Sequence, residues 1–234
     1  INNSIHNYLL TNFKTTKRLA KQSAKFGVKR FIFLSSIGVL GTNTNNQRPF
    51  IYSDEPNPIE NYAISKLKAE KALLKISKKT GLEIVVIRPP LIYGPSAPGN
   101  LKRLTKLVNT KFPLPFSLIK NKRSFIGIDN LVDVVVLCID HPNAKGKTFL
   151  VSDGDDLSTI DFIKKISEVK GFKVYMFPFP LFLLKILSFI ISKKKEMDRL
   201  TDTLQVDITY SKEMLSWTPR VSVNDGIKKM FSRR

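Results

Sequence analysis

Three side chains in the first third of the chain have the types and spacing of a proton-transfer site. Tyr62 and Lys66 are one helical turn apart, so on a helix they lie on one face and can reach the same bound molecule. A phenol is a poor base because its reference pKa is about 10, and a nearby ammonium group lowers that pKa by stabilising the phenolate. Ser36 follows an apolar run with the character of a strand, and open α/β sheets bind ligands at the carboxyl ends of strands. These residue types predict a catalytic site that moves a proton.

The pair Tyr62 and Lys66 is weak support when taken alone. The chain has 6 Tyr and many lysines, so a chance match to Tyr-x-x-x-Lys is expected. An amphipathic helix with a half-buried ring and a solvated charge would give the same pattern. The elements around the pair therefore have to distinguish the two interpretations.

Helices and strands alternate in the sequence around these residues. Helical spacing predicts helices over 2–26 and 61–80, and each is followed by a glycine. The continuous apolar runs within 30–35 and 83–88 are typical of strands buried on both faces of a parallel sheet. This order indicates a doubly wound α/β sheet with right-handed crossovers.

The elements become shorter after Gly94. A helix is predicted over 129–140 with Asp129 as its cap, and Ser158 and Ser222 are expected to open two later helices. The remaining predicted segments are extended and lie at 124–128, 147–151 and 172–177.

Composition limits the class of protein. The chain has 234 residues and is 42% hydrophobic, which suits one large domain or one domain plus a small lobe. Its net charge of +20 favours anionic partners, but the lysines are spread along the helices, as on a solvated surface. No nucleic-acid motif is present, and we expect no nucleic-acid partner. The single Cys138 excludes an internal disulfide, and no Cys/His cluster offers a metal site.

The segment 180–195 is strongly apolar and ends in three consecutive lysines. It is too short to span a membrane, which needs roughly 20 residues. Two interpretations stay open: a core helix of a C-terminal lobe, which we favour because short apolar segments usually indicate burial, and a helix lying in a membrane interface. We therefore expect a cytoplasmic protein, associated with a membrane only if the second interpretation holds.

Six stretches of the chain, in order and spacing, resemble the motifs of the extended short-chain dehydrogenase/reductase family. The resemblance is to its NAD-dependent epimerases and dehydratases of nucleotide sugars. The stretches are Asn12–Thr16, Phe33–Gly41, Tyr62–Lys66, Arg88–Pro95, Arg123–Asn130 and Leu215–Pro219. Together they cover most of the chain. The resemblance implies a Rossmann-like doubly wound sheet with a small C-terminal α/β substrate lobe. It places the dinucleotide-binding part in residues 1–95 and the lobe mainly in 96–234, with about 124–150 returning to the sheet.

The resemblance also implies roles for individual residues. Tyr62 would be the catalytic acid and base, Lys66 would hold the nicotinamide ribose and lower the tyrosine pKa, and Ser36 would bond the reacting oxygen. Further contacts to NAD or NADP are implied for Asn12, Ser35, Pro89 and Pro90. Contacts to the nucleotide-sugar substrate are implied for Ser36, Asn100, Leu101, Arg123 and Arg199. Arginine suits a diphosphate because its planar fork bonds two oxygens at once.

The chain departs from the family pattern at its start. None of its 11 glycines forms the Gly-rich turn that binds the dinucleotide pyrophosphate. We therefore expect an N-terminally truncated member, either a fragment of a longer enzyme or a non-catalytic remnant. A second departure is Leu91, where many sugar epimerases have Asn.

These observations lead to one preferred hypothesis and two alternatives. The preferred hypothesis is an NAD(P)-dependent epimerase or 4-keto reductase of a UDP-N-acetylhexosamine in surface polysaccharide synthesis. The alternatives are the non-catalytic remnant and a basic protein that binds anionic lipid or nucleic acid. The family often pairs protomers through the two long helices that here hold Asn12 and Tyr62, so the resemblance implies a homodimer.

Overall fold

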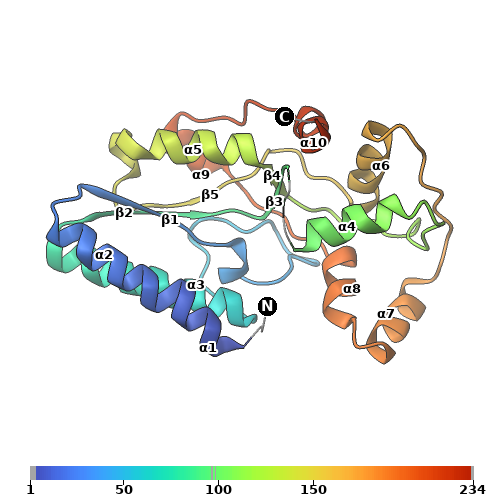
Figure 1. The fold of residues 1–234 in the computed structure, drawn as a ribbon, viewed down its shortest axis with the longest axis horizontal. Coiled ribbons are helices and arrows are strands. Elements are labelled where there is room, and N and C mark those ends of the chain that lie inside the picture. The colour runs from blue at the N-terminus through green and yellow to red at the C-terminus, as the bar shows by residue number, and fades with distance from the viewer. Residues whose placement is uncertain (1–3, 96, 98, 233–234) are drawn as a thin grey trace.

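The computed structural model describes residues 4–95, 97 and 99–232 (Figure 1). Its strands are β1 (Arg30–Leu34), β2 (Glu83–Arg88), β3 (Leu91–Tyr93), β4 (Phe125–Gly127) and β5 (Thr148–Leu150). Its α-helices are α1 (Ile5–Tyr8), α2 (Thr15–Lys25), α3 (Asn61–Thr80), α4 (Asn100–Asn109), α5 (Ile128–Asp140), α6 (Thr159–Val169), α7 (Leu181–Ile190), α8 (Lys194–Thr201), α9 (Thr209–Leu215) and α10 (Val223–Phe231). A π-helix, η1 (Leu9–Lys14), joins α1 to α2, and short 3₁₀-helices lie at η2 (Ile37–Val39) and η3 (Pro142–Ala144).

A parallel sheet with helices on both faces is the centre of the fold. Its strand order is β1-β2-β5, with Phe31 opposite Ile84 and Ile87 opposite Phe149. Helices α2 and α3 cover one face, and α5 with α9 covers the other (Figure 1). Every connection between neighbouring strands contains a helix, as parallel pairing requires. The predicted doubly wound α/β sheet is confirmed.

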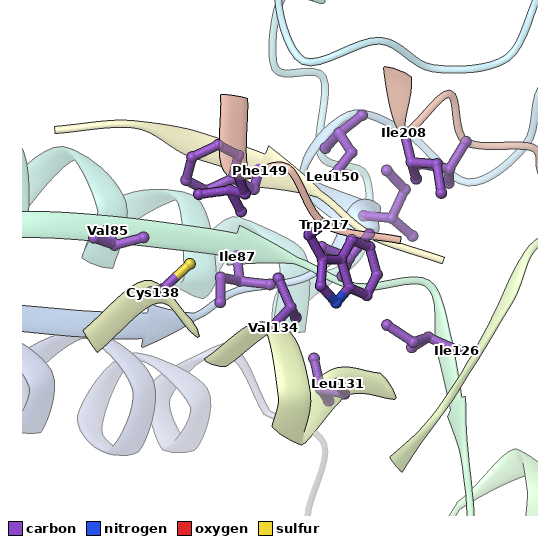
Figure 2. Close-up of a cluster of buried hydrophobic side chains, with 14 of the residues drawn as sticks. Val85, Ile87, Ile126, Leu131, Val134, Cys138, Phe149, Leu150, Ile208 and Trp217 are labelled. Atoms are coloured by element: carbon purple, nitrogen blue, oxygen red, sulfur yellow. The ribbon is translucent and has the colours of Figure 1, made fainter. Parts of the chain in front are cut away.

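Strand β2 shows why the apolar runs are continuous. Successive side chains of a strand point to opposite faces. Ile84 and Val86 pack in the core shared with α3, whereas Val85 and Ile87 pack in the core on the other face. The second core also contains Trp217 (Figure 2). Each face has its own apolar partners, so the four positions between Glu83 and Arg88 are all apolar.

The C-terminal lobe has a core of its own. Helices α4, α6, α7 and α8 lie beyond the carboxyl ends of the sheet strands, on the right of Figure 1. Strand β3 leads the chain into this lobe, and β4, which pairs with β3 in parallel, leads it back to α5 on the sheet. Phe125 stacks on Phe162 of α6 with ring centroids 4.4 Å apart, and Tyr93 meets the same ring edge-on.

Several expectations for this half of the chain are wrong in detail. Asp129 is not the cap of α5, because the helix begins one residue earlier and Gly127 holds the cap position. The expectation of an extended segment at 172–177 is met in part, because Met176 makes an isolated β-bridge to Leu114 but the segment forms no longer strand. The sequence also failed to predict β3, α4, α8 and α9. These elements are short, and their apolar residues are fixed by contacts with distant segments rather than by a local period.

The favoured interpretation of 180–195 as a core helix is also wrong. The helix α7 forms there, but only Leu184 and Ser188 are buried along it. Its other apolar side chains are exposed or only partly covered. None of the helices in the described residues has the length and apolar character needed to cross a membrane.

Candidate active site

The two serines after β1 point their hydroxyls in different directions. The Ser35 hydroxyl is buried and donates a short hydrogen bond to Glu70 of α3. Glu70 also forms a buried ion pair with Arg88, with 2.7 Å between Nη2 and Oε2. The Ser36 oxygen instead accepts a bond from the Gly38 backbone N–H at 3.1 Å. Since Glu70 holds the Ser35 hydroxyl in the interior, Ser36 is the better placed of the two to meet a ligand.

A close approach of two backbone segments brings Ser36 to the turn that holds Tyr62. A Cβ atom added at Gly38 would lie 3.4 Å from the Ala63 Cβ and 3.4 Å from the Ser36 Oγ. Gly38, in the middle of η2, therefore lies against the first turn of α3. Helix α3 begins after Glu60, whose backbone is extended, and ends at Gly81 with a φ of 76°.

Lys66 lies one turn after Tyr62 and reaches back to the end of β1. Its Nζ donates to the Leu34 carbonyl at 2.8 Å and lies over the rings of Phe33 and Tyr62, 4.8 Å and 5.6 Å from their centroids. Burial lowers the pKa of Lys66, and the Glu70 charge opposes that shift. An ammonium group has three N–H donors, so this geometry leaves donors for the hydroxyls of a bound ribose.

The phenol of Tyr62 has a raised pKa, mainly because it is partly buried and also because it lies near Tyr8. The two rings meet edge-on with centroids 5.7 Å apart. We expected Lys66 to lower the Tyr62 pKa, and in this structure it does not. The Lys66 ammonium is bonded to the Leu34 carbonyl, and desolvation of the phenolate dominates. The Tyr62 side chain is nevertheless 37% exposed, so a ligand can reach it.

Asn12 is linked to Tyr62 through Ser65. The Asn12 Nδ2 donates to the Ser65 Oγ at 3.0 Å, and that hydroxyl donates to the Tyr62 backbone carbonyl at 2.6 Å. Asn12 lies in η1, where the Thr15 N–H bonds the Leu10 carbonyl five residues back. Such π-helical turns are rare and are often found at functional sites. The side chain of Asn12 therefore supports the first turn of α3, which holds Tyr62.

Pro89 and Pro90 follow β2 and are buried at the carboxyl edge of the sheet. The Pro89 carbonyl accepts the Ile37 N–H at 2.9 Å, which fastens η2 to the end of β2. Lys66 adds cationic donors beside this buried apolar pair, at the same edge of the sheet. This chemistry fits the nicotinamide and ribose of NAD.

The structure also brings together the two arginines predicted to bind a diphosphate. The Arg123 Nη1 donates to the Asp202 carbonyl at 2.8 Å. Burial lowers the pKa of Arg123 to about 10, so it keeps its charge at neutral pH, and the charge of Arg199 contributes to the same shift. The Arg199 guanidinium pairs with Glu60 at 2.5 Å, directly before α3. Two cations of the lobe thus lie near the turn that holds Tyr62.

The other two predicted substrate residues begin helix α4. The side chain of Asn100 lies outside the described part of the structure. Leu101 is buried in the core of the C-terminal lobe, so only its backbone is placed to meet a ligand.

A cavity of about 570 Å³ opens elsewhere in the lobe. Lys120, Lys122 and Lys164 line it with Asp156 and Asp161, and none of the predicted catalytic or binding residues does. Among the described residues, no cluster of His, Cys, Asp and Glu side chains has the geometry to hold a metal ion.

Sequence reasoning missed four residues that support this site, namely Tyr8, Glu60, Ser65 and Glu70. Glu70 had a local signal, because it follows Lys66 by one helical turn. The other three are recognised only through contacts with distant segments or with the backbone.

Known proteins resemble the chain along most of its length. A model of the NAD dependent epimerase/dehydratase family matches residues 2–152. A UDP-glucose 4-epimerase of Vibrio cholerae is 43% identical over 223 residues, which cover 95% of this chain and 68% of that protein. An N-acetyl-alpha-D-glucosaminyl-diphospho-ditrans,octacis-undecaprenol 4-epimerase of Escherichia coli O157:H7 is 26% identical over 80% of this chain and 58% of its own length.

A solved structure has the same fold. The UDP-glucuronic acid 4-epimerase of Bacillus cereus in complex with NAD superposes with a TM-score of 0.73 at 20% identity, covering 96% of this chain and 67% of that one. The chain spans about two thirds of the length of this structure and of the Vibrio relative. The sequence match and the arrangement around Tyr62 lead to one conclusion: the chain belongs to the NAD dependent epimerase/dehydratase family.

Proposed function

We propose that the protein is an NAD-dependent epimerase of a nucleotide-linked sugar. The observation on which this depends is the placement of Tyr62 and Lys66 on the first turns of α3, against Ser36 and the carboxyl end of β1. In this proposal residues 1–95 belong to the cofactor-binding part. Residues 96–234 form mainly the substrate lobe, and about 124–150 return to the sheet.

The chain's own residues would move the proton and hold the reactants. NAD, when bound, supplies the hydride acceptor and returns the hydride. Tyr62 takes the proton of the sugar hydroxyl as the carbon is oxidised and gives it back on reduction. Ser36 bonds the same oxygen, while Lys66 holds the ribose and orients the cofactor. Pro89 and Pro90 exclude water from one side.

The diphosphate would lie between Arg123 and Arg199. Two guanidinium groups can neutralise the two phosphates and present several N–H donors to their oxygens. The binding energy gained there, away from the reacting carbon, helps to hold the sugar against Tyr62. Return of the hydride to the opposite face of the 4-keto sugar would give epimerisation with no net change in the cofactor. Reduction of a 4-keto substrate would instead consume one NAD(P)H and would use the same three residues.

The favoured substrate is a UDP-N-acetylhexosamine used in surface polysaccharide synthesis. The name of the Escherichia coli relative, which includes an N-acetylglucosaminyl diphosphate, favours the acetamido sugar. The name of the more similar Vibrio relative favours UDP-glucose as the competing substrate. An enzyme of UDP-sugars would work in the cytoplasm, and pairing through α2 and α3 would make it a homodimer.

Product analysis tests this proposal. The full-length protein is incubated with NAD and separately with UDP-glucose, UDP-galactose, UDP-N-acetylglucosamine or UDP-N-acetylgalactosamine, and the sugars are resolved by chromatography. We expect interconversion of the C4 epimers, fastest for the acetamido pair, and about a thousandfold slower with Tyr62→Phe. A protein that binds no NAD and converts none of the four sugars would instead be the non-catalytic remnant.

A further inference from the structure

Helix α7 exposes an apolar face to solvent. Ile186 and Ile190, one turn apart, are 51% and 69% exposed, and Phe182 and Phe189 beside them are 63% and 70% exposed. Leu184 and Ser188 are the buried residues of the helix. With 3.6 residues per turn, the four exposed side chains lie on the side of α7 opposite this buried pair. We call these four residues the outer face of α7.

This arrangement reverses the usual pattern of a surface helix. A surface helix normally turns apolar residues to the core and polar residues to water, and a helix that is apolar all round is normally buried. Here the inner stripe already packs on the lobe, and the outer face has no partner in the described part of the chain. Exposed apolar clusters of this kind usually mark an interaction surface.

Positive charge surrounds the outer face. The segment 180–195 contains Lys185 and the run Lys193–Lys195 but no acidic residue. All four lysines are exposed. The nearest acidic residue along the chain, Glu196, is paired with Arg103 of α4 at 3.3 Å. Lys185 is paired with Asp202, with 3.9 Å between Nζ and Oδ1, whereas Lys193–Lys195 form no ion pair with a described residue. Aromatic and aliphatic side chains next to such a run of lysines match a surface that is apolar inside and anionic at its edge.

We propose that the outer face of α7 docks the protein on an anionic lipid bilayer, with Lys193–Lys195 at the lipid phosphates. The helix lies in the plane of the interface and inserts Phe182, Ile186, Phe189 and Ile190 below the headgroups. This contact does not depend on the proposed sugar chemistry. It would hold the substrate lobe, in which Arg123 lies, close to the membrane surface.

A second copy of the chain fits this face less well. Two outer faces packed on each other would bring the lysine runs of both copies together, in a protein that already has a net charge of +20. Like charges at an interface oppose association. Nucleic acid would match the lysines but would leave the phenylalanines and isoleucines in water. An anionic bilayer satisfies both features at once.

Vesicle sedimentation with the full-length protein tests the proposal. Vesicles of phosphatidylcholine alone are compared with vesicles that contain one quarter phosphatidylglycerol. We expect I186S/F189S to weaken binding to the anionic vesicles by about tenfold per side chain or more. We expect K193E/K194E/K195E to weaken it by about a hundredfold, since each lysine near such a surface contributes about fivefold.

Two control variants test whether losing exposed apolar side chains or positive charge elsewhere on the surface weakens vesicle binding as much. V132S/V136S changes two exposed valines of α5, and K75E/K78E/K79E changes three exposed lysines of α3. Both controls should bind anionic vesicles about as well as the unchanged protein. Circular dichroism of every variant checks folding, and sedimentation velocity measures its mass.

The outcomes are distinct. Preferential binding to anionic vesicles, lost in both α7 variants and kept in both controls, supports the proposal. Equal binding to neutral vesicles, no binding at all, or binding that survives I186S/F189S in a folded protein overturns it. If the unchanged protein binds no vesicles and I186S/F189S halves the mass measured by sedimentation velocity, the outer face instead binds a second copy of the chain. Sugar conversion assayed without lipid tests the proposed function separately.

Discussion

The proposed proton-transfer region around Tyr62 and the cationic region around Arg123 are built in opposite ways. Tyr62 and Lys66 share helix α3, and Lys66 donates a hydrogen bond to the Leu34 carbonyl at the end of β1. Arg123 and Arg199 come from segments far apart in the chain and are held through the Asp202 carbonyl and Glu60. The first region is fixed by regular secondary structure, whereas the second depends on how the lobe packs against the sheet.

We interpret this difference as a division of roles, with catalysis in the first region and substrate selection in the second. Regular elements hold catalytic groups within a narrow geometry, as proton transfer requires. Loops and helix ends can change without disturbing those elements, so they are suited to select a substrate. We therefore expect changes in the first region to affect turnover or folding and changes in the second to affect substrate binding.

Removal of the Tyr62 hydroxyl should have the largest effect. Tyr62→Phe keeps the ring and its contact with Tyr8, so the fold should be retained while the proton acceptor is lost. We expect kcat to fall by about a thousandfold, within the range of general acid–base catalysis. Steady-state rates with a UDP-sugar and NAD measure it. Tyr8→Phe, which removes a neighbouring hydroxyl, is the control and should stay within a few-fold of the unchanged protein. A kcat for Tyr62→Phe close to that control would contradict the assignment.

Loss of the Glu70 charge should be the next largest effect, and it concerns folding. Glu70→Gln leaves the buried Arg88 guanidinium without a counter-charge, and such a break costs about 3 kcal/mol of unfolding free energy or more. Urea unfolding measures the change. Glu196→Gln removes the partner of Arg103 in an exposed pair and should cost less than about 1 kcal/mol. Equal losses of unfolding free energy in the two variants would show that the ion pair between Glu70 and Arg88 does not stabilise the fold.

Removal of the Arg123 charge should weaken substrate binding rather than turnover. Hydrogen bonds to charged groups contribute about 1.5–3 kcal/mol, so Arg123→Met should raise KM for a UDP-sugar by about tenfold to a hundredfold. The kcat should change little, because Arg123 does not belong to the proton-transfer region. Lys122→Met, at the exposed neighbouring position, is the control. A fall in kcat at unchanged KM would mean that the two regions are not separable.

The titration of Tyr62 gives a smaller effect. Burial and the nearby Tyr8 raise the Tyr62 pKa, so in the cofactor-free protein its phenolate should form at a higher pH than that of an ordinary tyrosine. Below that pKa, the base form increases about tenfold for each unit rise in pH, and steps that need the base should accelerate in the same direction. The absorbance difference between the unchanged protein and Tyr62→Phe during an alkaline titration isolates this group. A pKa near 7 would restore the expectation that Lys66 lowers it.

The contrast between local secondary structure and contacts of distant segments also explains how much of the structure the sequence could predict. The bounds of α3 and β2 were predicted residue for residue, since a helical period ending at Gly81 and a buried apolar run are local signals. The sequence also identified Tyr62, Lys66 and Arg123 as candidates through their motifs. It did not predict the bond from Asn12 to Ser65 or the π-helical turn, because both depend on how two helices pack. The exposure of α7 was missed for the same reason, since hydropathy does not show which faces find a partner.

The ion pair between Arg199 and Glu60 joins the two regions, so changing it tests whether they act separately. If Arg199 binds the diphosphate, it has to turn from Glu60 to the phosphate oxygens, and Glu60 competes with the substrate. Glu60→Gln removes that competing charge, and the pair is partly exposed, so the gain is at most about 1 kcal/mol. We expect KM for a UDP-sugar to fall by up to about fivefold, with kcat nearly unchanged. Glu60→Gln combined with Arg199→Met should lose this gain. A KM that rises in Glu60→Gln alone would show instead that Glu60 positions Arg199, and that the substrate needs the pair intact.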